Sequence, residues 1–154
     1  MTQLKYIEVE TQANPTASII WLHGLGASGN DFEPVVPEMH LPMGVRFIFP
    51  HAPNRTVTVN GGMVMPAWYD IISINIDRVI DTEQIMESAQ QIGELIEQEI
   101  SRGIPSERIF IAGFSQGGAV AYEAALSYPK PLGGVIALST YFATHKTIAW
   151  HDAN

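Results

Sequence analysis

The 154-residue chain contains no cysteine, so it carries no disulfide framework. Basic residues are also scarce: eight lysines and arginines face sixteen aspartates and glutamates, for a formal net charge of −8. A nucleic-acid-binding protein would present a basic face, and an anionic membrane would repel so acidic a chain. No apolar run approaches the roughly 20 residues of a transmembrane helix, and the first residues lack the pattern of a signal peptide. These absences predict a cytoplasmic protein without nucleic-acid or integral-membrane partners.

The residues that are present predict one domain over residues 1–154, because 46% of them are hydrophobic and can form a sizeable core. The strands that we expect, from alternating or continuous apolar runs, span residues 6–10, 17–22, 45–49, 109–112 and 134–138. The clearest helix follows Asp81 or Thr82 and ends at Gly103, with one apolar stripe formed by Ile85, Ala89, Ile92, Ile96 and Ile100. A second helix spans residues 118–128. Strands alternating with helices predict an α/β fold with a mainly parallel sheet and helices on both faces.

Three further segments have weaker patterns. Asn30 or Asp31 is expected to cap a short helix that contains Phe32. Residues 51–80 contain several prolines and glycines and predict a long irregular segment of the kind that often binds ligands. Residues 141–154 show no pattern. The carboxylates on the long helix are expected to form a solvated face, and they are Glu94, Glu97 and Glu99.

The pattern that points to chemistry is Gly-Phe-Ser-Gln-Gly at residues 113–117. A predicted buried strand precedes it and a small-residue helix follows it, which is the context of a nucleophile elbow. The flanking glycines remove Cβ atoms that would clash in so tight a turn, and the serine takes a strained backbone conformation. Ser115 is therefore the candidate nucleophile. The backbone N–H of Gln116 is expected to point to the same place.

A serine nucleophile needs a histidine base and a carboxylate that orients it, and in α/β hydrolases both follow the serine in the chain. After Ser115 the acidic residues are Glu123 and Asp152, and the histidines are His145 and His151. No histidine follows Asp152, and Glu123 lies two turns along the helix that leaves the elbow. The sequence therefore predicts a nucleophile without an Asp–His pair in the usual order.

The remaining polar candidates have structural interpretations. His23 ends a strand beside a glycine-rich loop and is expected to hold that loop, as is His51 after Phe49-Pro50. Asp70 and Asp77 precede the serine, and nothing in the sequence places a histidine beside either. No histidine and carboxylate group has metal-ligand spacing, so no metal and no other cofactor is expected. Gly24, Gly26 and Gly29 match a G-x-G-x-x-G phosphate loop, but no acidic residue about 20 positions on completes it.

Five segments of the chain resemble the phospholipase/carboxylesterase family, which includes bacterial carboxylesterases and acyl-protein thioesterases. They occur in the family's order and are Ile20–Gly26, Phe49–Pro53, Ala67–Asp70, Ala112–Ala119 and Ala137–Tyr141. The resemblance implies the α/β-hydrolase fold and a cytoplasmic serine carboxylesterase. Such an enzyme hydrolyses short-to-medium acyl esters or thioesters through an acyl-serine. The resemblance also favours a site with Ser115 as nucleophile and the N–H groups of Leu25 and Gln116 as the oxyanion hole.

The resemblance also favours substrate contacts from residues 51–80, where Met65 and Trp68 are candidates for an acyl pocket and core packing is the alternative. Family members continue into two further strands that carry the triad aspartate and histidine, so we expect a C-terminally truncated domain whose activity is impaired. The alternative function is an inactive fragment that binds or self-associates. Its open sheet edge at Val135–Leu138 could pair with a second copy, whose tail could in principle bring His145 or His151 to Ser115.

Overall fold

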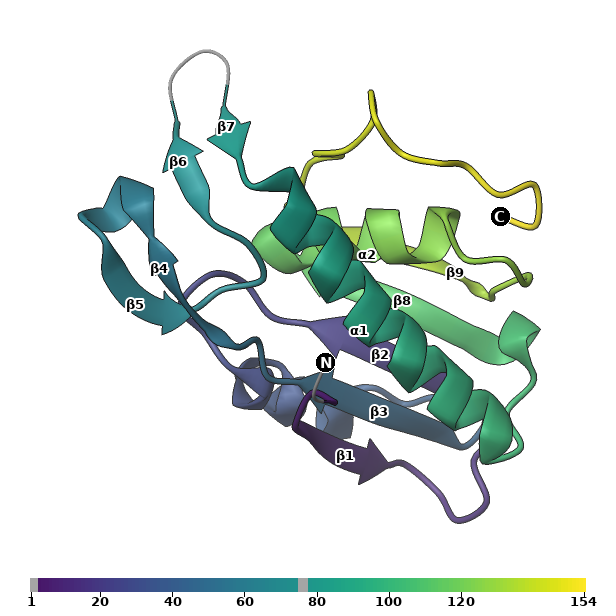
Figure 1. Ribbon diagram of the computed structural model, residues 1–154. Coiled ribbons are helices and arrows are strands. Elements are labelled where there is room, and N and C mark those ends of the chain that lie inside the picture. The colour runs from purple at the N-terminus through teal and green to yellow at the C-terminus, as the bar shows by residue number, and fades with distance from the viewer. Residues whose placement is uncertain (1–2, 75–77) are drawn as a thin grey trace.

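The computed structural model describes residues 3–74 and 78–154, and a five-stranded sheet forms its centre (Figure 1). Its strands, in spatial order, are β1 (Tyr6–Glu10), β3 (Val45–Pro50), β2 (Ala17–Leu22), β8 (Ile109–Phe114) and β9 (Gly134–Leu138). β1 runs antiparallel to β3, and the other neighbouring pairs are parallel. The predicted mainly parallel sheet is therefore confirmed, with each strand at its expected place in the sequence.

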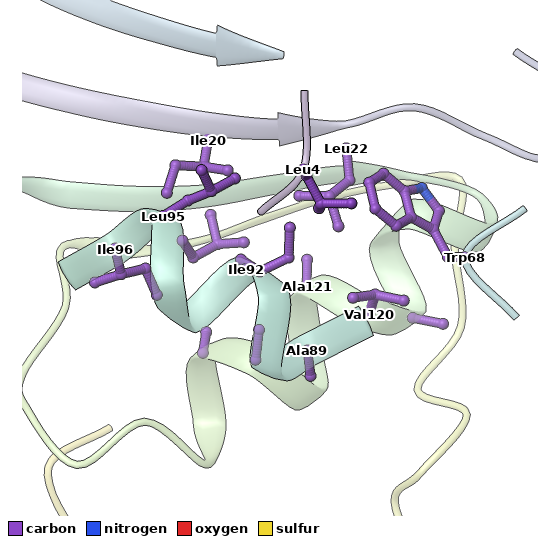
Figure 2. Packing of buried hydrophobic residues seen from close by; sticks show 14 of the residues in the cluster. Leu4, Ile20, Leu22, Trp68, Ala89, Ile92, Leu95, Ile96, Val120 and Ala121 are labelled. Carbon is purple, nitrogen blue, oxygen red and sulfur yellow. The ribbon is translucent and has the colours of Figure 1, made fainter. Parts of the chain in front are cut away.

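Both α-helices pack on one face of this sheet and contact each other. They are α1 (Thr82–Ser101) and α2 (Gln116–Leu126). The predicted stripe of α1 lies in this layer, with Ile85, Ile92 and Ile96 fully buried. Figure 2 shows side chains of α1 and α2 meeting those of Ile20 and Leu22 from β2. This layer is the larger of the two hydrophobic clusters, and it supports the strand and helix that carry Ser115.

Two 3₁₀ helices cover the opposite face. The predicted helix cap at Asn30 or Asp31 was wrong, because the cap is Ser28, and the short helix expected after it is a pair of 3₁₀ turns. η1 (Gly29–Asp31) is capped by Ser28, whose hydroxyl accepts from the N–H of Asn30 at 3.3 Å. η2 (Glu33–Glu38) follows, and two prolines within it remove the N–H groups that an α-helix would use. Aromatic residues of β2 and β3 pack against these turns, with Trp21 stacked on Phe32 at 5.0 Å between ring centroids.

Residues 51–80 are more ordered than the sequence predicts. β4 (Asn54–Val57) and β5 (Met63–Pro66) form a hairpin whose connection contains η3 (Thr58–Asn60). Gly61 and Gly62 follow η3 with φ of 68° and 79°, a conformation that glycine adopts readily. β6 (Ile71–Ser73) and β7 (Val79–Ile80) form a second, irregular pair. The prediction of a mostly irregular segment was wrong because prolines and glycines that punctuate hairpins were taken as continuous loop.

One member of the predicted solvated face of α1 is buried. Glu99 has no exposed surface and accepts hydrogen bonds from Arg46 of β3 at 2.8 Å and from Ser18 of β2 at 2.5 Å. Arg102, which follows α1, also pairs with Glu99 at 3.1 Å. Glu94 and Glu97 are exposed as expected. Among the described residues, no helix is long and apolar enough to cross a membrane.

Candidate active site

Ser115 lies between the end of β8 and the start of α2 with φ of 53° and ψ of −118°. A positive φ is uncommon for a residue with a side chain, and this pair of angles lies outside the main allowed regions. A Cβ on Gly113 would lie 2.4 Å from the carbonyl oxygen of Gly117. A Cβ on Gly117 would lie 2.5 Å from the carbonyl oxygens of Leu22 and His23 in turn. The glycines at both positions thus permit the close approach that the turn requires.

The end of β9 holds the backbone of the elbow. The N–H of Ser115 donates to the carbonyl of Leu138 at 3.0 Å, and the hydroxyl of Thr140 donates to the carbonyl of Ser115 at 2.5 Å. A Cβ on Gly118 would lie 2.4 Å from Thr140, so the helix start and this segment are in close contact. The hydroxyl of Ser115 has no hydrogen-bond partner in residues 3–74 and 78–154. The backbone N–H and carbonyl of Ser115 are thus both hydrogen-bonded, while its hydroxyl oxygen makes no hydrogen bond to the described residues.

The side chain of Gln116 has a role that the sequence analysis did not find. Its carbonyl accepts from the N–H of Trp68 at 2.8 Å, and its amide donates to the carbonyl of Tyr69 at 2.7 Å. All three residues are buried. Gln116 therefore joins the elbow to the segment between β5 and β6. Only the backbone N–H of Gln116 was predicted to matter, since a sequence pattern does not show which distant backbone a side chain meets.

The predicted oxyanion loop follows β2 and is tied to the end of β5. Gly26 donates from its N–H to the carbonyl of Pro66 at 2.8 Å, and the sulfur of Met65 lies near Gly26. The N–H of Leu25 has no acceptor in the described part of the chain. The N–H of Gln116 is one of the first four of α2, which the helix's own hydrogen bonds leave unpaired. Neither predicted donor therefore has a backbone acceptor among the described residues.

His23 is buried, and both of its ring nitrogens contact backbone. Nδ1 lies 2.7 Å from the carbonyl of Gly24, and Nε2 accepts from the N–H of Ala52 at 3.0 Å. Burial holds the pKa of His23 below its usual range, and the hydrogen bond to Gly24 opposes that shift. A neutral imidazole protonated on Nδ1 satisfies both contacts. His23 therefore bridges the loop after β2 and the segment after β3, as a structural histidine does.

His51, His145, His151 and Asp70 also form hydrogen bonds with backbone groups. His51 accepts from the N–H of Gly29 at 3.0 Å, and His145 and His151 are exposed with local contacts. Asp70 accepts from the N–H and the hydroxyl of Thr58 at 2.7 Å and 2.6 Å. Asp77 lies outside the described residues. In the part of the chain that the structure describes, no cluster of three or more histidine and acidic side chains could hold a metal ion.

The two candidate pocket residues have different environments. Met65 is half-buried beside the loop that contains Leu25, where its side chain borders the candidate oxyanion hole. Trp68 has no exposed surface, and its indole N–H donates to the carbonyl of His23 at 2.8 Å. Figure 2 shows the Trp68 ring within the hydrophobic cluster. The structure thus places Trp68 in the core beneath the site and Met65 at its border.

Comparison with known proteins gives this site its context. A family model described as Phospholipase/Carboxylesterase matches residues 4–154. Acyl-protein thioesterase 1 of Schizosaccharomyces pombe is 43% identical over 139 residues, which cover 90% of this chain and 62% of that protein. Acyl-protein thioesterase 1 of Cryptococcus neoformans is 38% identical over 154 residues, covering 96% of this chain and 64% of that protein.

Solved structures agree with this result. The crystal structure of Arabidopsis thaliana SOBER1 is similar with a TM-score of 0.78 and 37% identity, covering 82% of this chain and 62% of that one. Zea mays acyl-protein thioesterase 2 is similar with a TM-score of 0.77 and 29% identity, covering 89% and 62%. This chain thus spans less than two thirds of the length of these relatives. The predicted α/β-hydrolase fold is confirmed, and the chain belongs to the phospholipase/carboxylesterase family.

Proposed function

We propose that this chain provides the nucleophile and the oxyanion hole of a serine hydrolase that cleaves short-to-medium acyl esters or thioesters in the cytoplasm. The observation that carries the proposal is the positive φ of Ser115. The turn lies between Gly113 and Gly117, where a Cβ atom would clash with nearby backbone. The relatives named acyl-protein thioesterase support an acyl substrate. No cofactor is needed for this chemistry.

In the proposed reaction the hydroxyl oxygen of Ser115 attacks the acyl carbonyl, the hydroxyl proton passes through solvent water to the departing oxygen or sulfur, and the alcohol or thiol leaves to give an acyl-serine. The N–H groups of Leu25 and Gln116 stabilise the negative charge that develops on the carbonyl oxygen. Losing one such donor typically lowers kcat by about 10²–10³. Water then cleaves the acyl-serine. Met65 borders the acyl group, and Trp68 supports this region from the core.

No base accompanies Ser115 among the described residues, so we expect slow turnover from this chain. Sites that lack triad members but keep an oxyanion hole retain roughly 10³–10⁴ over the reaction in water. The test is labelling by a fluorophosphonate, read by intact mass, with Ser115→Ala as the control. Slow labelling of the unaltered chain that disappears in Ser115→Ala supports the proposal. Labelling that persists at the same rate in the variant contradicts it.

The exposed edge of the sheet supports a second candidate, a self-associating module without catalysis. β9 is the outer strand, and Ile136 and Ala137 within it are exposed. An apolar edge strand presents unpaired backbone groups that can pair with another chain. We therefore propose a homodimer formed along Val135–Leu138. Light scattering over a wide concentration range should show dimers that Ile136→Lys disrupts, whereas a monomer at every concentration would exclude this arrangement.

A further inference from the structure

A cavity of about 560 Å³ lies outside the elbow and is lined by residues from β7 and the start of α1 and by the segment that follows β9. Its charged side chains are Arg78 and Lys146, His145 also lines it, and no described aspartate or glutamate does. The chain has a net charge of −8 with only eight lysines and arginines, two of which meet here. The cavity therefore reverses the sign of charge that prevails over the rest of the molecule.

The positive charges of this cavity are not neutralised by described partners. Arg46, Arg55, Arg102 and Lys130 each form an ion pair with a described carboxylate, but Arg78 and Lys146 do not. Asp81 is close in sequence, yet it does not line the cavity and its carboxylate accepts from the N–H of Gln84. Within residues 3–74 and 78–154, neither cation of this concave site has an ion-pair partner, so both are available to an anion.

Arg78 is also held in a defined position. Its guanidinium lies over the Tyr141 ring, 4.5 Å from the ring centroid. The Tyr141 hydroxyl in turn lies 2.7 Å from the hydroxyl of Tyr69, which is buried. A cation fixed on an aromatic face loses less freedom when it binds a ligand, and a guanidinium matches the geometry of carboxylate and phosphate oxygens.

We propose that the cavity lined by Arg78, Tyr141 and Lys146 binds an oxyanion, a carboxylate or a phosphate group. Arg78 would donate two hydrogen bonds to it, and Lys146 would supply the second charge. The hydroxyl of Thr82 lies in the same lining and adds a neutral donor. The position suggests a source for the anion. Tyr141 of the lining directly follows Thr140, whose hydroxyl donates to the carbonyl of Ser115.

A first experiment does not depend on catalysis. Inorganic phosphate and succinate are titrated into the chain by calorimetry at low ionic strength, with Arg78→Gln, Lys146→Gln and Lys130→Gln as variants. Lys130 is the matched control because it is an exposed lysine outside the cavity, paired with Glu97. We expect saturable binding that salt weakens, at least about tenfold weaker in the first two variants and unchanged in the control. Absence of binding, or equal binding by Arg78→Gln with an unchanged circular dichroism spectrum, overturns the proposal.

A second experiment identifies the source of the oxyanion and rests on the proposed function. The rates of Ser115 acylation by p-nitrophenyl butyrate and by the anionic p-nitrophenyl hemisuccinate are compared. A preference for the anionic ester that Arg78→Gln removes assigns the cavity to a substrate's acidic group. Phosphate binding without that preference assigns it to a free anion. If neither ester acylates Ser115, the proposed function fails, while the calorimetric result for the cavity stands.

Discussion

At the scale of single residues, the elbow depends on atoms that glycine lacks. A Cβ on Gly117 of α2 would lie 2.5 Å from two backbone oxygens, which cannot move as a flexible side chain could. We expect Gly117→Ala to lower the free energy of unfolding by at least about 1–3 kcal/mol, the usual cost of overpacking a core. Urea denaturation followed by circular dichroism measures this change.

Gly93 of α1 gives the matched control, because a Cβ there meets nothing within 4 Å. Alanine is the better helix former by about 0.5–1 kcal/mol, so Gly93→Ala should stabilise the chain. Two glycine-to-alanine changes in helices would then have opposite signs. Equal changes in the two variants would mean that helix propensity decides the change in unfolding free energy, and that the close contact of Gly117 with the backbone of Leu22 and His23 does not.

Gln116 gives the second prediction at this scale. In Gln116→Leu the N–H of Trp68 and the carbonyl of Tyr69 lose their partner in a buried place. Each unsatisfied buried group costs about 1–3 kcal/mol, so the variant should be clearly destabilised in urea. Gln90→Leu, on the exposed face of α1, should stay within about 0.5 kcal/mol of the parent. A similar loss in both variants would show that leucine itself is responsible.

At the scale of elements, a buried ion pair joins the C-terminal half of α1 to the sheet. Glu99 is fully buried against Arg46, and the Arg46 side chain is only 9% exposed. Arg46 also pairs with Glu10 at 3.5 Å and with Glu8 at 4.0 Å. Loss of the Glu99 charge therefore leaves Arg46 partly compensated and should cost less than an isolated buried pair, for which the cost is about 3–5 kcal/mol. Glu99→Gln should lower the unfolding free energy by roughly 1.5–3 kcal/mol, the usual contribution of hydrogen bonds to a charged group, as measured in urea.

Glu94→Gln is the control for this prediction, since Glu94 lies on the exposed face of the same helix. Its effect should remain within about 0.5 kcal/mol. If Glu99→Gln lowered the unfolding free energy as little as Glu94→Gln, hydrogen bonds from Ser18 and Arg46 to a neutral amide would be sufficient to hold α1 on the sheet. The ionic character of the contact would then contribute little to the docking of α1.

The elements that the sequence predicted correctly are those whose burial follows from a local pattern of residue types. The stripe of α1 and the apolar runs of the five strands follow from burial with a fixed period, and the elbow follows from glycines flanking a serine between a strand and a helix. Glu99 shows where this reasoning stops. Because Glu99 lies near Glu94 and Glu97 in the sequence, it was expected to be exposed to solvent. Only the way in which α1 packs on the sheet places Glu99 against Arg46.

The same limit applies to contacts that join distant segments. The pairing of β4 with β5 was missed because the glycine pair after η3 also fits an open loop. The bridge from Gln116 to residues 68 and 69 spans 47 and 48 positions in the chain. No local pattern encodes such a distance, so these two contacts could not be predicted from the sequence.

At the scale of the whole molecule, His23 and Glu8 couple stability to pH, and the pKa of each shifts in the same direction. Burial lowers the pKa of His23, and a hydrogen bond from Arg102 lowers the pKa of Glu8. A lowered folded-state pKa means that the unfolded chain binds more protons, so stability falls as the pH falls. Each contribution is fully present above the unfolded pKa, which is about 6.5 for histidine and about 4.3 for glutamate.

The last prediction therefore concerns the shape of the stability profile. The unfolding free energy should be level just above about pH 7 and should begin to fall below about pH 6.5, because protonated His23 can no longer accept from the N–H of Ala52. A further fall below about pH 4.3 should follow as Glu8 is protonated. Urea denaturation at a series of pH values measures the profile. His23→Gln should remove the first slope even if it lowers stability throughout, while exposed His40→Asn should leave that slope intact. A parent chain equally stable at about pH 5 and pH 7 would mean that His23 does not hold the two segments together as a neutral imidazole.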